Sequence, residues 1–199
     1  MVNTLLRKTL FVALMVVGSC VRAEPGAWKI IPEQSSLSFT ATQNGAPVGG
    51  AFKHFNGEIF VDPDNYKASR IHIVVDMKSV STTYTELAST LMSAPWFDSV
   101  QFGTAEFTAE SFKSLGENRW QAMGTVKIRN ISAPVTLTFT TSQPDADTGR
   151  VEGDTTLQRT RFGVGQGEWA STKEVADNVH VHFIVVAKKT ASQAASPSR

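Results

Sequence analysis

Cysteine is nearly absent from this chain of 199 residues, in which Cys20 is the only one. A single cysteine cannot form a disulfide within the chain, so a fold stabilised by internal disulfides is excluded. The sequence also lacks a Gly-x-Ser-x-Gly elbow, a His-Glu-x-x-His helix and a phosphate-binding P-loop, which carry common hydrolytic and nucleotide chemistry. The domain must therefore be stabilised by burial of apolar side chains, and cysteine chemistry and P-loop chemistry are excluded.

An excess of one charge is missing as well. The chain has 19 Lys and Arg residues against 18 Asp and Glu residues, and no stretch concentrates the basic ones. Nucleic-acid binders need such a basic face, so no nucleic-acid partner is expected. The hydrophobic fraction of 41% and the charged fraction of 19% are typical of a domain that folds in water, which excludes a disordered chain and a multi-span membrane protein.

Long hydrophobic runs are limited to one, near the N-terminus. Arg7 and Lys8 precede the apolar residues 10–17, and small and polar residues follow as far as Ala23. This is the layout of a secretory signal peptide, and the apolar run is too short to span a bilayer. Cleavage after Ala23 removes three positively charged residues and no negatively charged one, which leaves a net charge of −2.

The expected domain organisation follows from the two ends of the chain. Residues 1–23 are predicted to be the signal peptide, residues 24–189 the folded domain, and residues 190–199 a disordered tail rich in Ala and Ser. A second interpretation is a bacterial lipoprotein, because residues 17–20 resemble an acylation site that would make Cys20 the N-terminal residue. Both interpretations export the domain.

A period of two residues dominates the body of the chain. Leu37, Phe39 and Ala41 alternate with serine and threonine, which is the pattern of a strand with one buried face. The same alternation, with turn-forming residues between segments, predicts further strands at 48–55, 57–61, 71–77, 105–112, 120–128, 135–140, 151–159 and 179–187. Only residues 83–93 have helical spacing, so the fold class is all-β. A closed barrel and a two-sheet sandwich both hide strand edges, and periodicity leaves both open.

Three histidines are the best candidates for a metal site. His180 and His182 lie two residues apart on a predicted strand and would share one face, and His72 lies on another strand. The residues of opposite parity, such as Val181 and Phe183, are apolar, so the imidazoles are expected to face solvent. No metal site is therefore predicted, and a histidine-dependent metal enzyme is only a further hypothesis.

Short motifs in a fixed order carry a resemblance to a known family. Residues 50–63 read Gly-Ala-Phe-Lys-His-Phe-Asn-Gly-Glu-Ile-Phe-Val-Asp-Pro, and residues 71–82 contain Ile-x-Ile-x-Val-Asp-x-x-Ser-Val-x-Thr. Residues 91–98, 124–128 and 159–163 add Leu-x-x-x-x-Trp-Phe-Asp, Gly-x-Val-x-Ile and Arg-x-x-Phe-Gly. Because these motifs follow one another at matching gaps, the chain resembles the YceI family of exported lipid-binding proteins.

The resemblance implies an extended, lipocalin-like antiparallel β-barrel of about eight strands with one short helix around residues 83–93. Its apolar tunnel would hold a polyisoprenoid, an isoprenoid quinone or a fatty-acid-like amphiphile, in the bacterial periplasm. The family implies no reaction and no cofactor apart from this lipid, whose transport, storage or sequestration would be the function. The resemblance is also compatible with contact between the protein and a membrane during lipid exchange, and with a dimer of two barrels. It decides neither.

The tunnel is expected to be lined by the apolar parity of the strands and by aromatic residues from the loops. The predicted lipid-binding residues are Leu37, Phe39, Phe52, Phe55, Ile71, Ile73, Val75, Leu91, Phe97, Phe107, Val126, Ile128, Leu137, Phe139, Phe162 and Phe183.

Arg159 and Arg161 are the candidates for contact with a lipid head group. Arg159 has the strand parity of Thr155 and Leu157, which would point it inward, and an unpaired buried guanidinium would be too costly. The alternative for this side chain is an internal ion pair with Asp or Glu. The resemblance carries no head-group chemistry here, because residues 87–91 read Leu-Ala-Ser-Thr-Leu where the family often has Arg-Asp-x-His-Leu.

The alternative function is an interaction module with a filled core. The apolar residues of a generic β-domain pack against one another, and such a module would act through surface loops such as residues 162–169. Composition alone does not distinguish a filled barrel from a hollow one.

Overall fold

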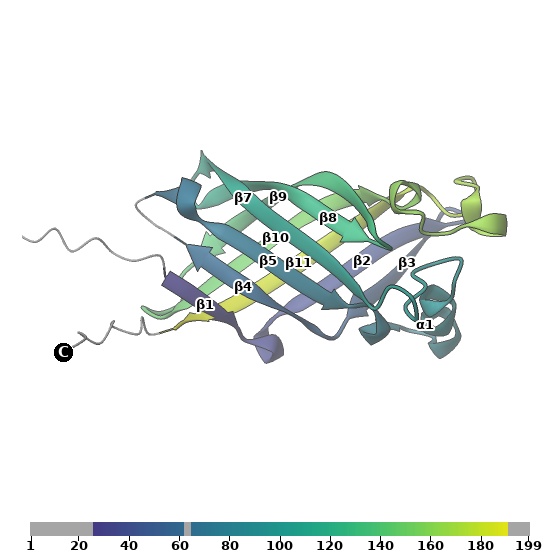
Figure 1. The fold of residues 1–199 in the computed structure, drawn as a ribbon, viewed down its shortest axis with the longest axis horizontal. Helices are drawn as coiled ribbons and strands as arrows, with labels where there is room; N and C mark the ends of the chain where they lie inside the picture. Colours follow the sequence, from purple (N-terminus) through teal and green to yellow (C-terminus); the bar gives the residue numbers. More distant parts are fainter. Residues whose placement is uncertain (1–25, 62–64, 191–199) are drawn as a thin grey trace, which may run out of the picture.

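The structure is a computed structural model that describes residues 26–61 and 65–190 as one long β-barrel (Figure 1). The strands of this part of the chain form a single antiparallel sheet. The strands that close the barrel are β1 (Gly26–Ile30), β4 (Phe55–Val61), β5 (Arg70–Asp76), β7 (Thr104–Gly116), β8 (Arg119–Ile128), β9 (Ile131–Ser142), β10 (Thr148–Gln158) and β11 (Asn178–Lys189).

The barrel is closed by pairing between its first and last strands. Around the ring the strands follow the order β1-β4-β5-β7-β8-β9-β10-β11, and β1 then pairs with β11. In this closing pair Trp28 lies opposite Lys189, and Ile30 lies opposite Ala187. Closure removes the exposed edges of a sheet. The predicted antiparallel barrel of about eight strands is confirmed, and the sandwich is not found.

Three further strands lengthen the wall at one end. They are β2 (Ser36–Gln43), β3 (Ala46–Phe52) and β6 (Val80–Thr82). β2 pairs with β11 at positions 180–184, which β1 leaves unpaired, and β3 and β6 continue outward from β2. The strand β11 therefore takes a different neighbour at each end of the barrel.

Helical segments are few and short. The one α-helix of the described residues is α1 (Thr85–Met92), inside the predicted range 83–93. The 3₁₀ segments are η1 (Pro32–Gln34), η2 (Tyr66–Ala68), η3 (Met77–Ser79), η4 (Arg159–Phe162) and η5 (Gly167–Ala170). None of the helices in the described ranges has the length and apolar character needed to cross a bilayer.

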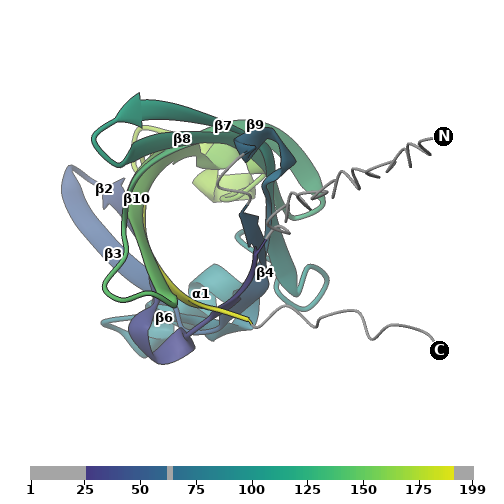
Figure 2. The same cartoon turned by 90° about the vertical axis from the view of Figure 1, so that its left-hand side faces the viewer.

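The two ends of the barrel differ in what covers them. We call the end that carries α1, the loop 93–103, η4 and η5 the helical end. The mouth is the opposite end, where the β7–β8 and β9–β10 hairpins, η2, the start of β1 and the end of β11 meet. The mouth lies at the left in Figure 1, and Figure 2 looks into it with α1 at the far end.

Tight packing is concentrated at the helical end. Leu91, Trp96, Phe162, Val164 and Val175 form a buried cluster there, with exposed fractions of 8% or less. A second and smaller cluster in the wall is built around Ala109, Ala122 and Phe139. Among the described residues no large side chain is completely buried, which is unusual for a domain of this size and points to a hollow centre.

Three glycines allow neighbouring strands of the wall to approach closely, and one of them is Gly57, whose added Cβ would lie 2.2 Å from the carbonyl oxygen of His72. A Cβ added at Gly124 would lie 2.1 Å from the carbonyl oxygen of Thr108, and one added at Gly153 would lie 2.3 Å from that of Thr138. No other residue fits these positions without movement of the neighbouring backbone. Glycines of this kind mark tight bends in a strongly coiled sheet.

The predicted strands correspond to observed ones, with differences at their ends. The strand predicted at 48–55 stops at Phe52, and the strand predicted at 151–159 stops at Gln158, where the chain turns into η4. The short strands β1 and β6 were not predicted, because three to five residues carry too little alternation. The predicted signal peptide and all of the predicted tail except Thr190 lie outside the described residues.

Candidate functional site: the barrel cavity

The barrel encloses a cavity of about 730 Å³. An eight-stranded barrel is just wide enough either to be filled by side chains or to hold one ligand. Here the inward-facing side chains are largely Val, Ile, Leu and Phe, and they leave the centre empty. The volume lies within the range of binding pockets for small molecules. The filled core that the interaction-module hypothesis requires is not found.

All sixteen residues predicted to bind lipid lie against this cavity. Most are placed there by alternation along a strand, as are Ile71, Ile73 and Val75 on β5. Leu91, Phe97 and Phe162 reach it from α1 and from the loops of the helical end. The structure thus brings the predicted set together around one space, and contact of these residues with lipid remains a prediction.

Several lining residues do not belong to the set predicted from the strand pattern. They are chiefly Trp28, Phe60, Tyr66, Met77, Trp96, Phe112, Trp120, Val151, Leu157, Val179, Val181 and Val185. Trp120 and Val181 share strand parity with residues that were predicted, so strict use of that parity would have found them. Tyr66 lies in η2 and Trp28 in a strand of five residues, where the sequence gives no periodic signal.

The helical end of the cavity is sealed by packed aromatic rings. The ring centroids of Phe39 and Phe52 lie 5.7 Å apart, those of Phe52 and Phe97 5.8 Å, and those of Trp96 and Trp169 5.5 Å. The indole Nε1 of Trp96 is completely buried and has no hydrogen-bond partner in the described part of the chain. Since this atom is closed off from solvent-sized space, it faces away from the cavity. Packed aromatic rings therefore make up much of the wall at this end of the cavity.

The mouth is more open and more polar. Tyr66, which is 42% exposed, stacks at a tilt on Trp120 with 4.5 Å between ring centroids. Around this pair the cavity is lined by exposed or half-buried polar residues, namely Asn118, Thr141, Ser142, Gln143 and Arg150. Arg150 is paired, because its Nη2 lies 2.6 Å from Glu152 Oε2. A ligand can therefore enter and leave most directly at the mouth.

Arg159 lies at the helical end and is held by the backbone. It is 4% exposed, and its three nitrogens donate hydrogen bonds of 2.8 to 3.3 Å to carbonyl oxygens. The acceptors are the carbonyl oxygens of Val164, Gly165, Ser171, Val175 and Ala176. Burial lowers the pKa of the guanidinium, and the negative charge of Asp177 opposes this shift.

These contacts favour a structural role for Arg159. Arg159 is part of the cavity lining, and its guanidinium donates to backbone carbonyls and forms no internal hydrogen-bonded ion pair with the described residues. The reason is that β10 ends at Gln158, so Arg159 starts η4 and reaches the loops 164–176. A role of this residue in binding a lipid head group remains a prediction that the geometry does not favour.

Arg161 lies outside the main cavity, so the structure does not bring the two arginines together. It lines a separate side pocket of about 180 Å³ between β9, the end of β10 and η4. This pocket exists because β9 and β10 stop pairing beyond Thr138 and Asp154. Thr155, Leu157 and Phe162 line both spaces. Arg161 makes no hydrogen bond or ion pair with the described residues.

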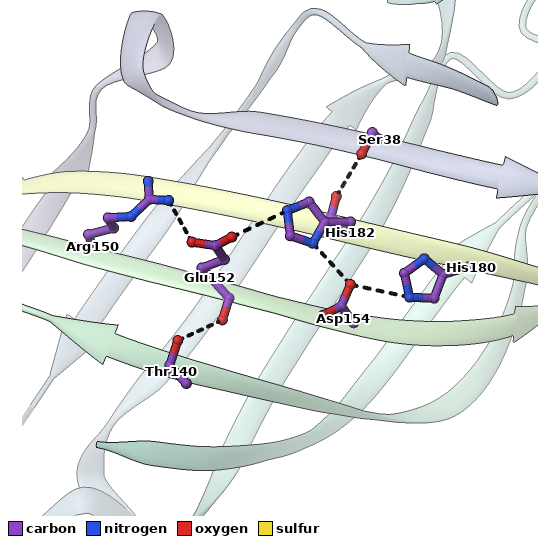
Figure 3. Close-up of polar contacts among 7 residues, drawn as sticks. All are labelled: Ser38, Thr140, Arg150, Glu152, Asp154, His180 and His182. Atoms are coloured by element: carbon purple, nitrogen blue, oxygen red, sulfur yellow. Dashed lines mark hydrogen bonds and ion pairs between the residues drawn. The ribbon is translucent and has the colours of Figure 1, made fainter. Parts of the chain in front are cut away.

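The histidines lie on the outside of the barrel, as expected from strand parity. His182 Nδ1 lies 2.9 Å from Asp154 Oδ1, and His180 Nε2 lies 3.2 Å from the same oxygen (Figure 3). His72 is remote from this pair and contacts Glu106 at 3.4 Å. In the ranges that the structure describes, no three His, Cys, Asp or Glu side chains are arranged to hold a metal ion. His180, His182 and Asp154 thus belong to an exposed network of charged and polar side chains.

Comparison with known sequences matches most of this chain to one family. Residues 28–187 match the family model described as YceI-like domain. A UPF0312 protein of Vibrio vulnificus is 27% identical over 104 residues, which cover 52% of this chain and 55% of the relative. The chain thus matches about half the length of this curated relative.

Comparison with solved structures supports the same assignment. BcnA of Burkholderia cenocepacia superposes with a TM-score of 0.75 at 27% identity, over 79% of this chain and 98% of BcnA. A polyisoprenoid binding domain from Saccharophagus degradans, implicated in plant cell wall breakdown, superposes with a TM-score of 0.66 at 11% identity, over 82% and 98% of the two chains, which shows a shared fold. The motifs, the hollow barrel and the family match agree, and this chain belongs to the YceI-like family.

Proposed function

We propose that this protein binds one long-chain amphiphilic lipid, a polyisoprenoid or a chain of similar length, and transports, stores or sequesters it without chemical change. The observation that carries the proposal is the cavity of about 730 Å³ with its largely apolar lining. Water finds few hydrogen-bond partners along such a lining, so an apolar chain is the favoured occupant.

The energetics of such a complex are favourable. Each CH₂ group that leaves water contributes about 0.8 kcal/mol. A few isoprene units therefore offset an association cost of roughly 4–15 kcal/mol and leave enough for micromolar affinity. The binding site needs shape and apolar surface, and no catalytic group. The description of the Saccharophagus degradans domain as polyisoprenoid-binding supports the same ligand class.

The setting of this function is part of the proposal. The signal peptide expected at residues 1–23 directs the protein to the periplasm, where insoluble lipids need a carrier between membranes. The mouth would contact a membrane surface during lipid exchange, because it is the more open end of the cavity. No cofactor other than the lipid is required.

The test is to identify what the protein carries. The chain is expressed with its signal peptide in a Gram-negative bacterium, purified from the periplasm without detergent, extracted with organic solvent and analysed by mass spectrometry. We expect one long-chain lipid per protein molecule. The matched control is Leu137→Trp, which places an indole in the cavity and should carry much less lipid. Absence of lipid from the wild-type protein, together with no uptake of added prenol or fatty alcohol, would contradict the proposal.

A further inference from the structure

We infer that the lipid is bound in one direction: its apolar end lies against the helical end, and its polar end is an uncharged, hydrogen-bonding group, such as a hydroxyl or carbonyl, at the mouth. This inference rests on the proposed function and adds to it the orientation and the class of head group.

The helical end cannot satisfy a polar head group. The residues that close it, Leu91, Trp96, Phe162, Val164 and Val175, are apolar and at most 8% exposed. Two polar residues, Thr155 and Arg159, also line the cavity toward this end, and the hydroxyl of Thr155 donates to the carbonyl oxygen of Thr136. The donors of Arg159 are engaged by backbone carbonyls, and Nε1 of Trp96 is buried away from the cavity. A hydroxyl or phosphate placed there would lose its hydration without gaining a partner, which costs several kcal/mol and is avoided in proteins.

The mouth offers the partners that the helical end lacks. The amide groups of Asn118 and Gln143 and the hydroxyl groups of Thr141, Ser142 and Tyr66 come from different segments of the same rim. Gln143 uses one of its two side-chain N–H donors on the carbonyl oxygen of Ala146, so one remains. Amides and hydroxyls can donate to and accept from a neutral polar group, and water completes its hydration.

The charges at the mouth favour a neutral head group over an anionic one. Arg150 is the one cation that lines this rim among the described residues, and Glu152 Oε2 lies 2.6 Å from its Nη2. A phosphate would have to compete with this carboxylate for the guanidinium. An alcohol or a carbonyl has no such requirement.

An aromatic pair stands between the apolar cavity and the polar rim. The rings of Tyr66 and Trp120 contact each other at 4.5 Å, and both line the cavity. Amphipathic rings occur where one side is apolar and the other is wet. Their position marks the level at which the ligand changes from hydrocarbon to head group.

The side pocket presents the competing arrangement. Arg161 has a guanidinium with no partner in the described residues, and the threonine hydroxyls of β9 and β10 lie nearby. An anionic head group would be suited to it. Phe162, only 2% exposed, lines both this pocket and the cavity together with Leu157 and Thr155, so these side chains lie between a chain bound in the cavity and Arg161.

Tryptophan fluorescence can test the direction of the ligand, because the chain has four tryptophans and they lie in two pairs. Trp28 and Trp120 line the cavity near the mouth, and Trp96 and Trp169 pack together at the helical end. The double variant W96F/W169F keeps the first pair, and W28F/W120F keeps the second. Each variant is titrated with a long-chain alcohol brominated either at its methyl end or next to its hydroxyl, since bromine quenches nearby indoles.

Bromine at the methyl end should quench Trp96 and Trp169 at least twofold more than Trp28 and Trp120, and bromine next to the hydroxyl should give the reverse order. The opposite pattern, or equal quenching of both pairs by both probes, overturns the orientation. Failure of the wild-type chain to bind any of these alcohols counts against the proposed function itself. Unlabelled alcohol serves as a control for binding, and urea unfolding as a control that each variant is folded.

The class of head group is tested with a fatty acid of matched chain length. Its affinity relative to the alcohol is measured below and above the pKa of its carboxyl group, so that the alcohol corrects for effects of pH on the protein. We expect the relative affinity to fall about tenfold when the carboxyl group ionises, and Arg161→Gln to change it less than twofold. Equal or tighter binding of the ionised acid would overturn the inference, and a tenfold loss in Arg161→Gln would place the anionic head group in the side pocket.

Discussion

Arg159 and Arg161 are separated by one residue and have opposite environments. Arg159 is buried and donates to five backbone carbonyls, whereas Arg161 is exposed and has no partner in the described residues. The separation follows from the 3₁₀ geometry of η4, with three residues per turn, in which residues two apart point in different directions. Alternation along a strand, which the sequence suggested here, would have placed both on one face.

The first prediction concerns these two side chains. Arg159→Ala should lower the free energy of unfolding by about 3 kcal/mol, because buried carbonyl groups lose their donors. Arg161→Ala should change it by less than about 0.5 kcal/mol. Urea unfolding followed by tryptophan fluorescence measures both. Equal stability of the two variants would show that the carbonyl contacts of Arg159 contribute nothing.

At the scale of elements, the strands and their inward faces follow from the sequence where the alternation is long enough. Leu37 and Phe39 on β2, and Leu137 and Phe139 on β9, are examples of inward residues that the period of two identifies. The rim of the mouth does not follow from it, because Tyr66 lies in a 3₁₀ turn and Gln143 in a hairpin. Their position depends on which loops the closed barrel brings together, and this is not a local property.

The second prediction tests the close approach of β9 and β10. Gly153→Ala should destabilise the protein by about 1–3 kcal/mol, because its Cβ would lie 2.3 Å from the carbonyl oxygen of Thr138 and 2.6 Å from Cβ of Phe139. Gly49→Ala on β3 is the matched control, since its nearest atom would be 3.7 Å away. Thermal unfolding monitored by circular dichroism gives both values. A neutral Gly153→Ala would mean that the wall relaxes easily at this point.

At the scale of the whole molecule, the interior of the barrel is a cavity and not a core of packed side chains. The third prediction follows from the presence of this cavity. Leu137→Trp should weaken lipid binding at least tenfold without loss of stability, because the larger ring enters vacant space and displaces no side chain. Thr140→Trp on the outer face of the same strand is the control and should bind as the wild type does. Displacement of a fluorescent fatty alcohol measures both affinities.

The fourth prediction concerns removal of the lipid. A ligand that binds only the folded state stabilises it by about 2.7 kcal/mol when its concentration is one hundred times its Kd. For a chain of this length that amount corresponds to roughly 5–10 °C in Tm. Calorimetry should therefore show a lower Tm after delipidation, and the original value should return when lipid is added back. An unchanged Tm would indicate that the cavity is not occupied in the purified protein.

The points where the described chain enters and leaves the barrel determine how the protein can be attached to a support. Gly26 and Thr190 both lie at the mouth, where the backbone of Thr190 donates to the carbonyl oxygen of Ala27 at 2.8 Å. A tether joined to the barrel beside either of these two residues would hold the loading side toward the surface that carries it. Val100, which is 90% exposed in the loop of the opposite end, is a better attachment point: a cysteine introduced there and coupled to a bead or sensor chip would leave the opening turned toward the solution.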